Sequence, residues 1–139
     1  MKKIIFVAII FGVLLLSKPL ALLAQGCTGE EEGPVSEKCL NTRPCLYLGK
    51  HIVTEGVYID TSTSILDDWH HDKCTRFSSK EYVNFRTNDI FQYFMKNDIA
   101  GTLCPLKAGD KIIISGCVRT CEDKRPWVEV DSVVKAPRE

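Results

Sequence analysis

The stretch that decides the fold is Ala-Gly-Asp-Lys-Ile-Ile-Ile-Ser-Gly-Cys-Val, residues 108–118. It begins with a turn at Ala108–Asp110 and continues as a β-branched run that a single glycine, Gly116, interrupts. β-Branched residues favour strands, and a glycine inside a strand permits a sharp bend or the close approach of another backbone. Strands of small closed barrels need such bends. The stretch therefore predicts one bent strand of a small β-barrel.

Other segments extend this pattern in both directions. Residues 51–60 form a second β-branched and aromatic run with a central glycine, Gly56. The strand that begins at Lys111 is expected to continue to Cys121. The polar turn 122–126 then leads into an alternating run at 127–134. Each of these runs predicts a strand.

The centre of the chain is expected to hold two short strands and one helix. Residues 74–78 and the alternating residues 80–87 are interpreted as strands. In residues 89–97 the apolar side chains recur at helical spacing, which predicts a short helix with Asn88 or Asp89 as its N-cap. The predicted order is therefore three strands, one helix and two strands.

This order resembles the OB-fold. Residues 108–118 resemble the G-D-x-V-x-V-x-G-x-V fourth strand of many such domains, and residues 126–133 resemble their closing P-x-I-x-V-x-x-I strand. When the strand at residues 51–60, with its Gly56, is included, the likeness spans roughly residues 50–135. The resemblance implies a mainly β, five-stranded OB-like Greek-key barrel with one short helix between strands 3 and 4. We expect disulfides to stabilise it.

The N-terminus has the pattern of a secretory leader. Lys2 and Lys3 precede an apolar run of 13 residues, Ile4–Leu16, and small residues stand at Ala24 and Gly26. A charged start, a short apolar core and small residues at the cleavage site are typical of a signal peptide. Residues 1–26 are therefore interpreted as a signal peptide, with an uncleaved membrane anchor as the alternative.

Cysteine counting links this leader to the rest of the chain. The bond before Cys27 resembles a bacterial lipobox, in which that cysteine is acylated, although ordinary signal peptidase would also accept it. The chain has seven cysteines, and an odd count leaves one over in an oxidising compartment. A lipid on Cys27 leaves six candidates for disulfides: Cys39, Cys45, Cys74, Cys104, Cys117 and Cys121. The alternative is a Cys27 that is unpaired or disulfide-bonded.

Composition divides the mature chain into a tether and one domain. Residues 27–38 are acidic and contain Gly and Pro, which predicts a flexible tether. Residues 39–135 are expected to form the OB-like domain, and residues 136–139 a C-terminal tail. Cleavage of the leader removes three lysines and leaves 15 basic against 18 acidic residues. This charge disfavours general nucleic-acid binding. It also disfavours attachment to a membrane through a cluster of basic residues, so contact with a membrane is expected only through the N-terminal lipid.

Three residues are predicted to form a ligand-binding surface on the outside of the barrel. If Val83 and Val128 point inward, then Tyr82, Arg86 and Trp127 point outward. An aromatic side chain beside an arginine can stack on a sugar, a base or a partner side chain. The alternative is that Trp127 covers an end of the barrel.

Metal binding and catalysis receive less support. His70, His71 and Cys74 are potential zinc ligands, but they lack the usual spacings, so a solvated loop that ends in a disulfide is the preferred interpretation. The serines lack the G-x-S-x-G context of a hydrolase nucleophile. No catalytic residue and no cofactor is predicted.

The sequence therefore predicts a non-enzymatic exported module that binds an envelope protein or a small ligand. We expect it in the periplasm or tethered to a membrane as a lipoprotein, with secretion as the alternative. The competing functions are a metal-binding protein that uses His70, His71 and cysteine thiols, and a purely structural envelope component.

Overall fold

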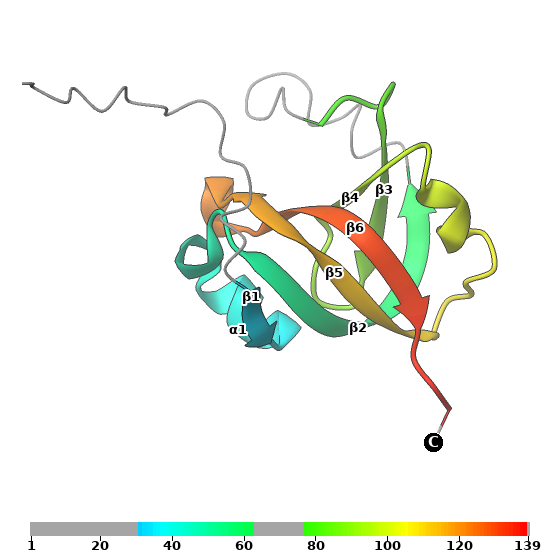
Figure 1. Ribbon diagram of the computed structural model, residues 1–139, viewed down its shortest axis with the longest axis horizontal. Helices are drawn as coiled ribbons and strands as arrows, with labels where there is room; N and C mark the ends of the chain where they lie inside the picture. The colour runs from blue at the N-terminus through cyan, green and yellow to red at the C-terminus, as the bar shows by residue number, and fades with distance from the viewer. Residues whose placement is uncertain (1–30, 63–76, 139) are drawn as a thin grey trace, which may run out of the picture.

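The computed structural model describes residues 31–62 and 77–138, which are mainly β (Figure 1). The strands are β1 (Glu31–Pro34), β2 (His51–Ser62), β3 (Tyr82–Thr87), β4 (Tyr93–Lys96), β5 (Lys111–Thr120) and β6 (Trp127–Lys135). The helical segments are the α-helix α1 (Glu37–Thr42) and the 3₁₀-helices η1 (Pro44–Tyr47), η2 (Ala100–Leu103) and η3 (Glu122–Lys124). None of these helices is long and apolar enough to cross a membrane.

Strands β2 to β6 close into a five-stranded barrel, and β1 adds to an edge of β2. Residues 51–57 of β2 pair with β5, and residues 58–62 pair with β3, so β2 joins the two ends of the sheet. Within the barrel only β4 and β6 run parallel, which makes the sheet mixed. This closed, disulfide-bonded barrel confirms the predicted fold class and is compatible with an OB-like fold.

Two glycines are required where other groups approach the backbone. A Cβ atom on Gly116 would lie 2.4 Å from the carbonyl oxygen of Glu129 in β6, at a register shift between β5 and β6. A Cβ atom on Gly56 would lie 2.6 Å from a carboxylate oxygen of Glu37. Both contacts are too short for any other residue to be accommodated without movement. The mid-strand glycines therefore have the role that the sequence predicts for them.

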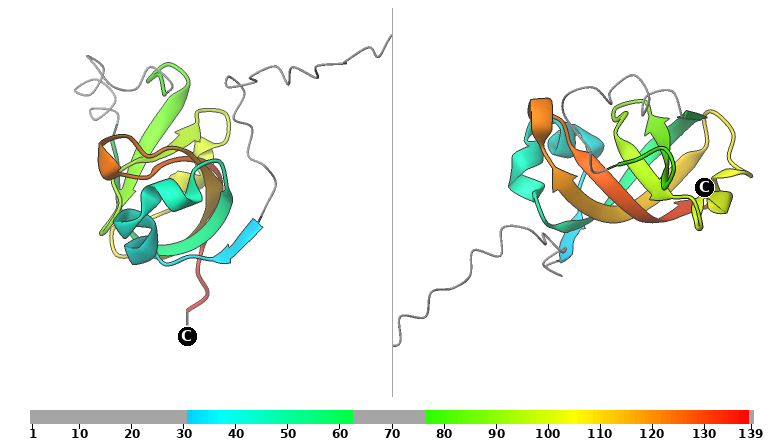
Figure 2. Two further views of the ribbon diagram at one scale, coloured as in Figure 1. Left: turned by 90° about the vertical axis from the view of Figure 1, so that its left-hand side faces the viewer. Right: turned by 90° about the horizontal axis from the view of Figure 1, so that it is seen from above.

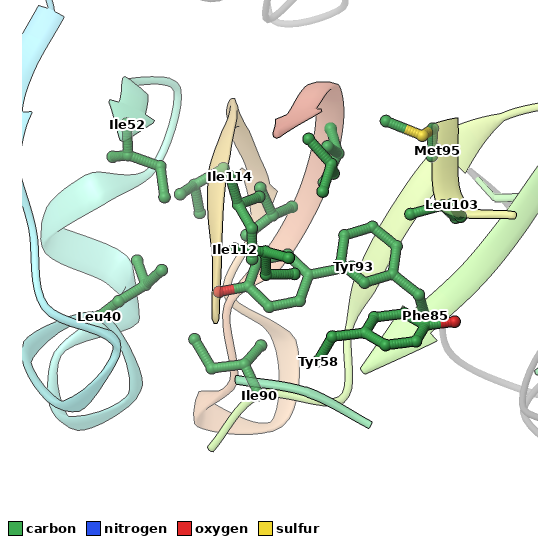
Figure 3. Close-up of a cluster of buried hydrophobic side chains, with 14 residues drawn as sticks. Leu40, Ile52, Tyr58, Phe85, Ile90, Tyr93, Met95, Leu103, Ile112 and Ile114 are labelled. Carbon is green, nitrogen blue, oxygen red and sulfur yellow. The ribbon is translucent and has the colours of Figure 1, made fainter. Parts of the chain in front are cut away.

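The barrel interior is filled by apolar side chains that point inward from all five strands (Figure 3). Helix α1 closes one end of the barrel, where Leu40 is fully buried, and η2 lies at the opposite end, where it contributes Leu103 (Figures 1 and 2). The buried cluster consists of Leu40, Ile52, Tyr58, Phe85, Ile90, Tyr93, Met95, Leu103, Ile112, Ile114, Val118, Val128, Val130 and Val133.

A buried carboxylate joins α1 to this interior. Oε1 of Glu37 accepts hydrogen bonds from the hydroxyls of Tyr93 and Thr87, each at 2.7 Å. Burial raises the pKa of Glu37, and it raises the pKa of Tyr93 well above 10, so the tyrosine stays a protonated donor. We call these three residues the Glu37 network. They fix α1 on the barrel through polar contacts as well as through Leu40.

The helix predicted at residues 89–97 is wrong, because Tyr93–Lys96 forms strand β4. Tyr93 and Met95 point into the barrel, while Phe94 packs with an aromatic cluster outside it. A strand that is buried on both faces gives a continuous apolar run, which cannot be distinguished from a helix by periodicity alone. The short helix between the third and fourth barrel strands is η2 instead.

Residues 31–38, the described part of the predicted tether, include regular secondary structure. β1 pairs in parallel with the start of β2, with Glu31 opposite His51. Ser36 then caps α1 by accepting a hydrogen bond from the backbone N–H of Cys39 at 3.2 Å. The described part of the predicted tether, residues 31–38, therefore contains strand β1 and the start of α1. The sequence does indicate this helix, because Ser36 followed by Glu37 is typical of a helix N-terminus.

Disulfide pairing confirms part of the cysteine prediction. Cys45 in η1 and Cys121 before η3 form a disulfide with an S–S length of 2.08 Å. Cys117 is also disulfide-bonded. Two of the six disulfide candidates, Cys39 and Cys104, carry free, exposed thiols.

Candidate functional site

The predicted ligand surface is largely buried. Trp127 is 2% exposed and Tyr82 is also buried, and both lie on the outside of the barrel in a cluster with Phe77 and Phe94. We call these four residues the outer aromatic cluster. Phe94 stacks on Phe77 at a ring distance of 4.2 Å and on Trp127 at 5.5 Å. Tyr82 and Trp127, two of the three predicted ligand residues, therefore have buried rings.

Polar groups at the edge of this cluster are also engaged within the chain. Glu129 accepts one hydrogen bond from the Tyr82 hydroxyl at 3.2 Å and another from Nε of Arg119 at 2.6 Å. Burial, followed by the negative charge of Glu129, raises the pKa of Tyr82. The indole N–H of Trp127 donates to the backbone carbonyl of Glu122 at 3.2 Å. These contacts make the outer aromatic cluster a second small core.

Arg86 is the one predicted ligand residue that lies at the surface. Its guanidinium donates two hydrogen bonds to the Asp60 carboxylate, at 2.7 and 2.8 Å. The same guanidinium lies over the ring of Phe91, 5.7 Å from its centre. The hydrogen bond to Asp60 raises the pKa of Arg86. Arg86 therefore stands beside Asp60, which lines the groove described next.

A groove of about 630 Å³ opens at the η2 end of the barrel. We call it the η2 groove. One side comes from β2 and β3 and the other from the segment 100–108. Most of the lining is apolar, and the polar groups come from Asp60, Thr61, Cys104 and the hydroxyl of Tyr58. The groove is lined by Tyr58, Ile59, Asp60, Thr61, Val83, Ala100, Gly101, Leu103, Cys104, Leu106 and Ala108.

The groove follows from the local sequence at this end. OB-folds place a helix between the third and fourth strands, but here Pro105 follows a single 3₁₀ turn, η2, and proline opposes continuation of a helix. On the opposite side, the Tyr58 hydroxyl shares a 2.6 Å hydrogen bond with Thr61. Among the described residues, one turn of helix with small residues covers this barrel end, and the η2 groove opens beside it. Pockets of this size and apolar character are typical of small-molecule sites.

Ser115, His51 and Asp131, residue types that hydrolases use together, also meet on the barrel surface. Nε2 of His51 lies 2.7 Å from Oδ2 of Asp131 and 3.3 Å from Oγ of Ser115. A serine hydrolase uses the two ring nitrogens of its histidine separately, one for the serine and one for the carboxylate. Because a single nitrogen faces both partners here, the arrangement does not fit that mechanism.

The metal alternative falls mostly outside the described residues. His70, His71 and Cys74 all lie in the segment 63–76, of which the structure says nothing. In the rest of the domain, residues 31–62 and 77–138, no three His, Cys, Asp or Glu side chains gather as a metal site would require. Cys27, the predicted lipidation site, also lies outside the described residues.

Sequence reasoning missed the η2 groove. Its residues come from two segments, 58–61 and 100–108, and only the fold brings them together. The available signal is the run Ala-Gly-Thr-Leu-Cys-Pro-Leu-Lys-Ala at 100–108, where small and apolar residues stand in place of a full helix. Because the one predicted helix is placed at residues 89–97, the run 100–108 is expected to hold no helix.

Fold and groove together define the class: a closed, mixed five-stranded β-barrel, compatible with an OB-like fold, with an apolar groove at one end. Comparison with known protein families and with curated proteins gave no match to this chain.

Proposed function

We propose that this chain is a non-enzymatic binding module that holds a small, mostly apolar ligand in the η2 groove. The observation that carries the proposal is the groove itself, which combines an apolar lining with few polar groups. The outer surface offers less, because Tyr82 and Trp127 are already buried there. A ligand in the groove would complete the cover that η2 begins.

The lining also indicates the charge of the ligand. Among the described residues that line the groove, Asp60 is the only charged one, and both of its oxygens already accept hydrogen bonds from Arg86. A charged ligand would lose solvation without gaining an unpaired opposite charge, and that loss is costly. Thr61 can exchange hydrogen bonds with one polar group. We therefore infer an uncharged ligand with an apolar body and one hydrogen-bonding group.

We propose that the chain is exported to the bacterial envelope and tethered by a lipid on Cys27. The leader sequence supports export, and the Cys45–Cys121 disulfide fits an oxidising compartment. The intact mass of the mature chain tests the tether: a diacyl or triacyl addition at Cys27 is expected. A mature chain that begins at Cys27 or earlier without any acyl group would contradict it.

The groove is tested by titration with N-phenyl-1-naphthylamine, an uncharged probe of the proposed class. We expect saturable binding of one equivalent, with a rise in probe fluorescence as the ring leaves water. Ala108 is exposed and lines the groove, so Ala108→Trp is expected to fill the groove without disturbing the core. Probe affinity should fall at least about tenfold, which corresponds to 1.4 kcal/mol.

Ala136→Trp provides the matched control. It introduces the same side chain after β6, outside the residues that line the groove. Its probe affinity should equal that of the wild type. The proposal fails if the probe does not bind, or if both tryptophan variants bind it as the wild type does.

A further inference from the structure

The end of the barrel opposite the η2 groove carries a separate exposed surface. There η1 follows directly after α1, and the Cys45–Cys121 disulfide ties η1 to the loop that begins η3 (Figure 2). We call this region the stapled end. A cleft of about 300 Å³ runs between α1 and η1 and is lined by Lys38, Cys39, Thr42, Arg43, Leu46 and Tyr47.

Two leucines stand out at this end. Leu46 is 59% exposed and Leu48 is 38% exposed, although the neighbouring Pro44 is buried and Tyr47 is half-buried. The η1 turn therefore buries one face and presents the other to solvent, and the disulfide at Cys45 holds it in that orientation. An apolar pair held outward on a cross-linked turn exposes surface that a partner can bury.

Cations accompany the leucines. Lys38 and Arg43 line the cleft and are exposed, and neither makes an ion pair within the part of the chain that the structure describes. No carboxylate is among the described residues that line the cleft. In η3 the acidic Glu122 and Asp123 stand beside a lysine and an arginine, so the charges there balance. Lys38 and Arg43 are therefore exposed cations without an ion pair to a described residue, whereas Glu37, the carboxylate of α1, faces the barrel interior.

The course of the chain places this surface beside the proposed anchor. β1 begins at Glu31, opposite His51 at the start of β2, which follows η1 by only a few residues. Cys27 precedes Glu31 by four residues, and four extended residues span at most about 14 Å. A lipid at Cys27 would therefore hold the stapled end close to the membrane and leave the η2 groove on the far side.

We propose that the stapled end docks on an anionic lipid surface. Leu46 and Leu48 enter the headgroup region, and Lys38 and Arg43 contact lipid phosphates. Each basic residue near an anionic bilayer adds attraction that depends on lipid charge, and apolar side chains add burial that does not. The inference rests on the proposed export and not on the groove, which is measured separately with N-phenyl-1-naphthylamine.

The two native free thiols provide the test. Cys39 lies in the cleft of the stapled end, and Cys104 lines the η2 groove at the other end of the barrel. The full chain is mixed with vesicles of phosphatidylcholine and phosphatidylglycerol and treated with a membrane-impermeant maleimide. Mass spectrometry of peptides then gives the reaction rate of each cysteine. Cys39 should react about tenfold more slowly than without vesicles, and Cys104 should be nearly unchanged.

Matched charge reversals separate docking from simple tethering. Lys38→Glu with Arg43→Glu should abolish the protection of Cys39, whereas Lys96→Glu with Lys107→Glu, at exposed positions outside the stapled end, should retain it. Vesicles of phosphatidylcholine alone should protect Cys39 less. Equal protection of both thiols, or none, would overturn the proposal. Protection of Cys39 without vesicles at high protein concentration would indicate a second copy as the partner and would also overturn it.

Discussion

Trp127→Ala is expected to destabilise the domain by about 3–5 kcal/mol, the usual cost of removing a buried tryptophan. The indole is 2% exposed and stacks on Phe94 with its ring plane tilted by 5°. It also supplies the N–H that the Glu122 carbonyl accepts. Truncation would leave a cavity between β6 and the ring of Phe94. Urea denaturation followed by circular dichroism gives the free energy of unfolding of both proteins.

Phe91→Ala is the matched control for this experiment. Phe91 is 41% exposed and contacts the Arg86 guanidinium from outside the barrel. Its removal should cost less than about 1 kcal/mol, because an exposed cation–π contact contributes about 0.5–1 kcal/mol. If Trp127→Ala were as stable as Phe91→Ala, the indole would be exposed in solution and the outer face would again be available to a ligand.

Glu37→Leu is expected to cost about 2–3 kcal/mol, because it leaves the Tyr93 hydroxyl buried without an acceptor. Thr87 loses less, since its hydroxyl also donates to the carbonyl of Ile90 at 3.3 Å. Adding Tyr93→Phe should recover most of the lost stability, because replacing both partners by apolar groups removes the orphaned donor. A double variant no more stable than Glu37→Leu would show that the cost comes from packing and not from the hydrogen bond.

The pH dependence provides an independent readout of the same network. Burial raises the pKa of Glu37 in the folded state, and the hydrogen bonds from Thr87 and Tyr93 oppose this shift. The native state therefore holds the proton more tightly than the unfolded chain does. This stabilisation is complete below the ordinary pKa of 4.5 and is lost as the pH rises through the raised value. Glu37→Gln should remove this component and leave a flatter dependence of unfolding free energy on pH.

Much of the barrel could be predicted because its strands follow simple local rules. Residues 111–118 and 127–134 pair as the sequence indicates, and Gly56 and Gly116 lie where the backbone meets another group. These signals are local, because a β-branched run and a mid-strand glycine each restrict the backbone directly. Strand β4 could not be recognised in this way, since Phe94 faces a second core that only the closed barrel creates.

The burial of Tyr82 and Trp127, two predicted ligand residues, could not be predicted from the sequence for a related reason. Alternation correctly places Tyr82 and Trp127 outside the barrel. It carries no information about Phe77, which packs against Tyr82 at 5.0 Å and stacks on Phe94. The orientation of a side chain relative to a sheet is a local property, whereas its exposure depends on the whole fold. The η2 groove likewise depends on the whole fold, because the segments 58–61 and 100–108 that line it meet only in the closed barrel.

Amide hydrogen exchange of the full chain, with and without N-phenyl-1-naphthylamine, tests the central claim most directly. That claim is that the ligand site is the η2 groove and not the outer face. The account predicts that the bound probe slows exchange in residues 58–61 and 100–108, which line the groove. Slowed exchange at residues 77–82 and at the start of β6, around the outer aromatic cluster, with the groove unchanged, would contradict it.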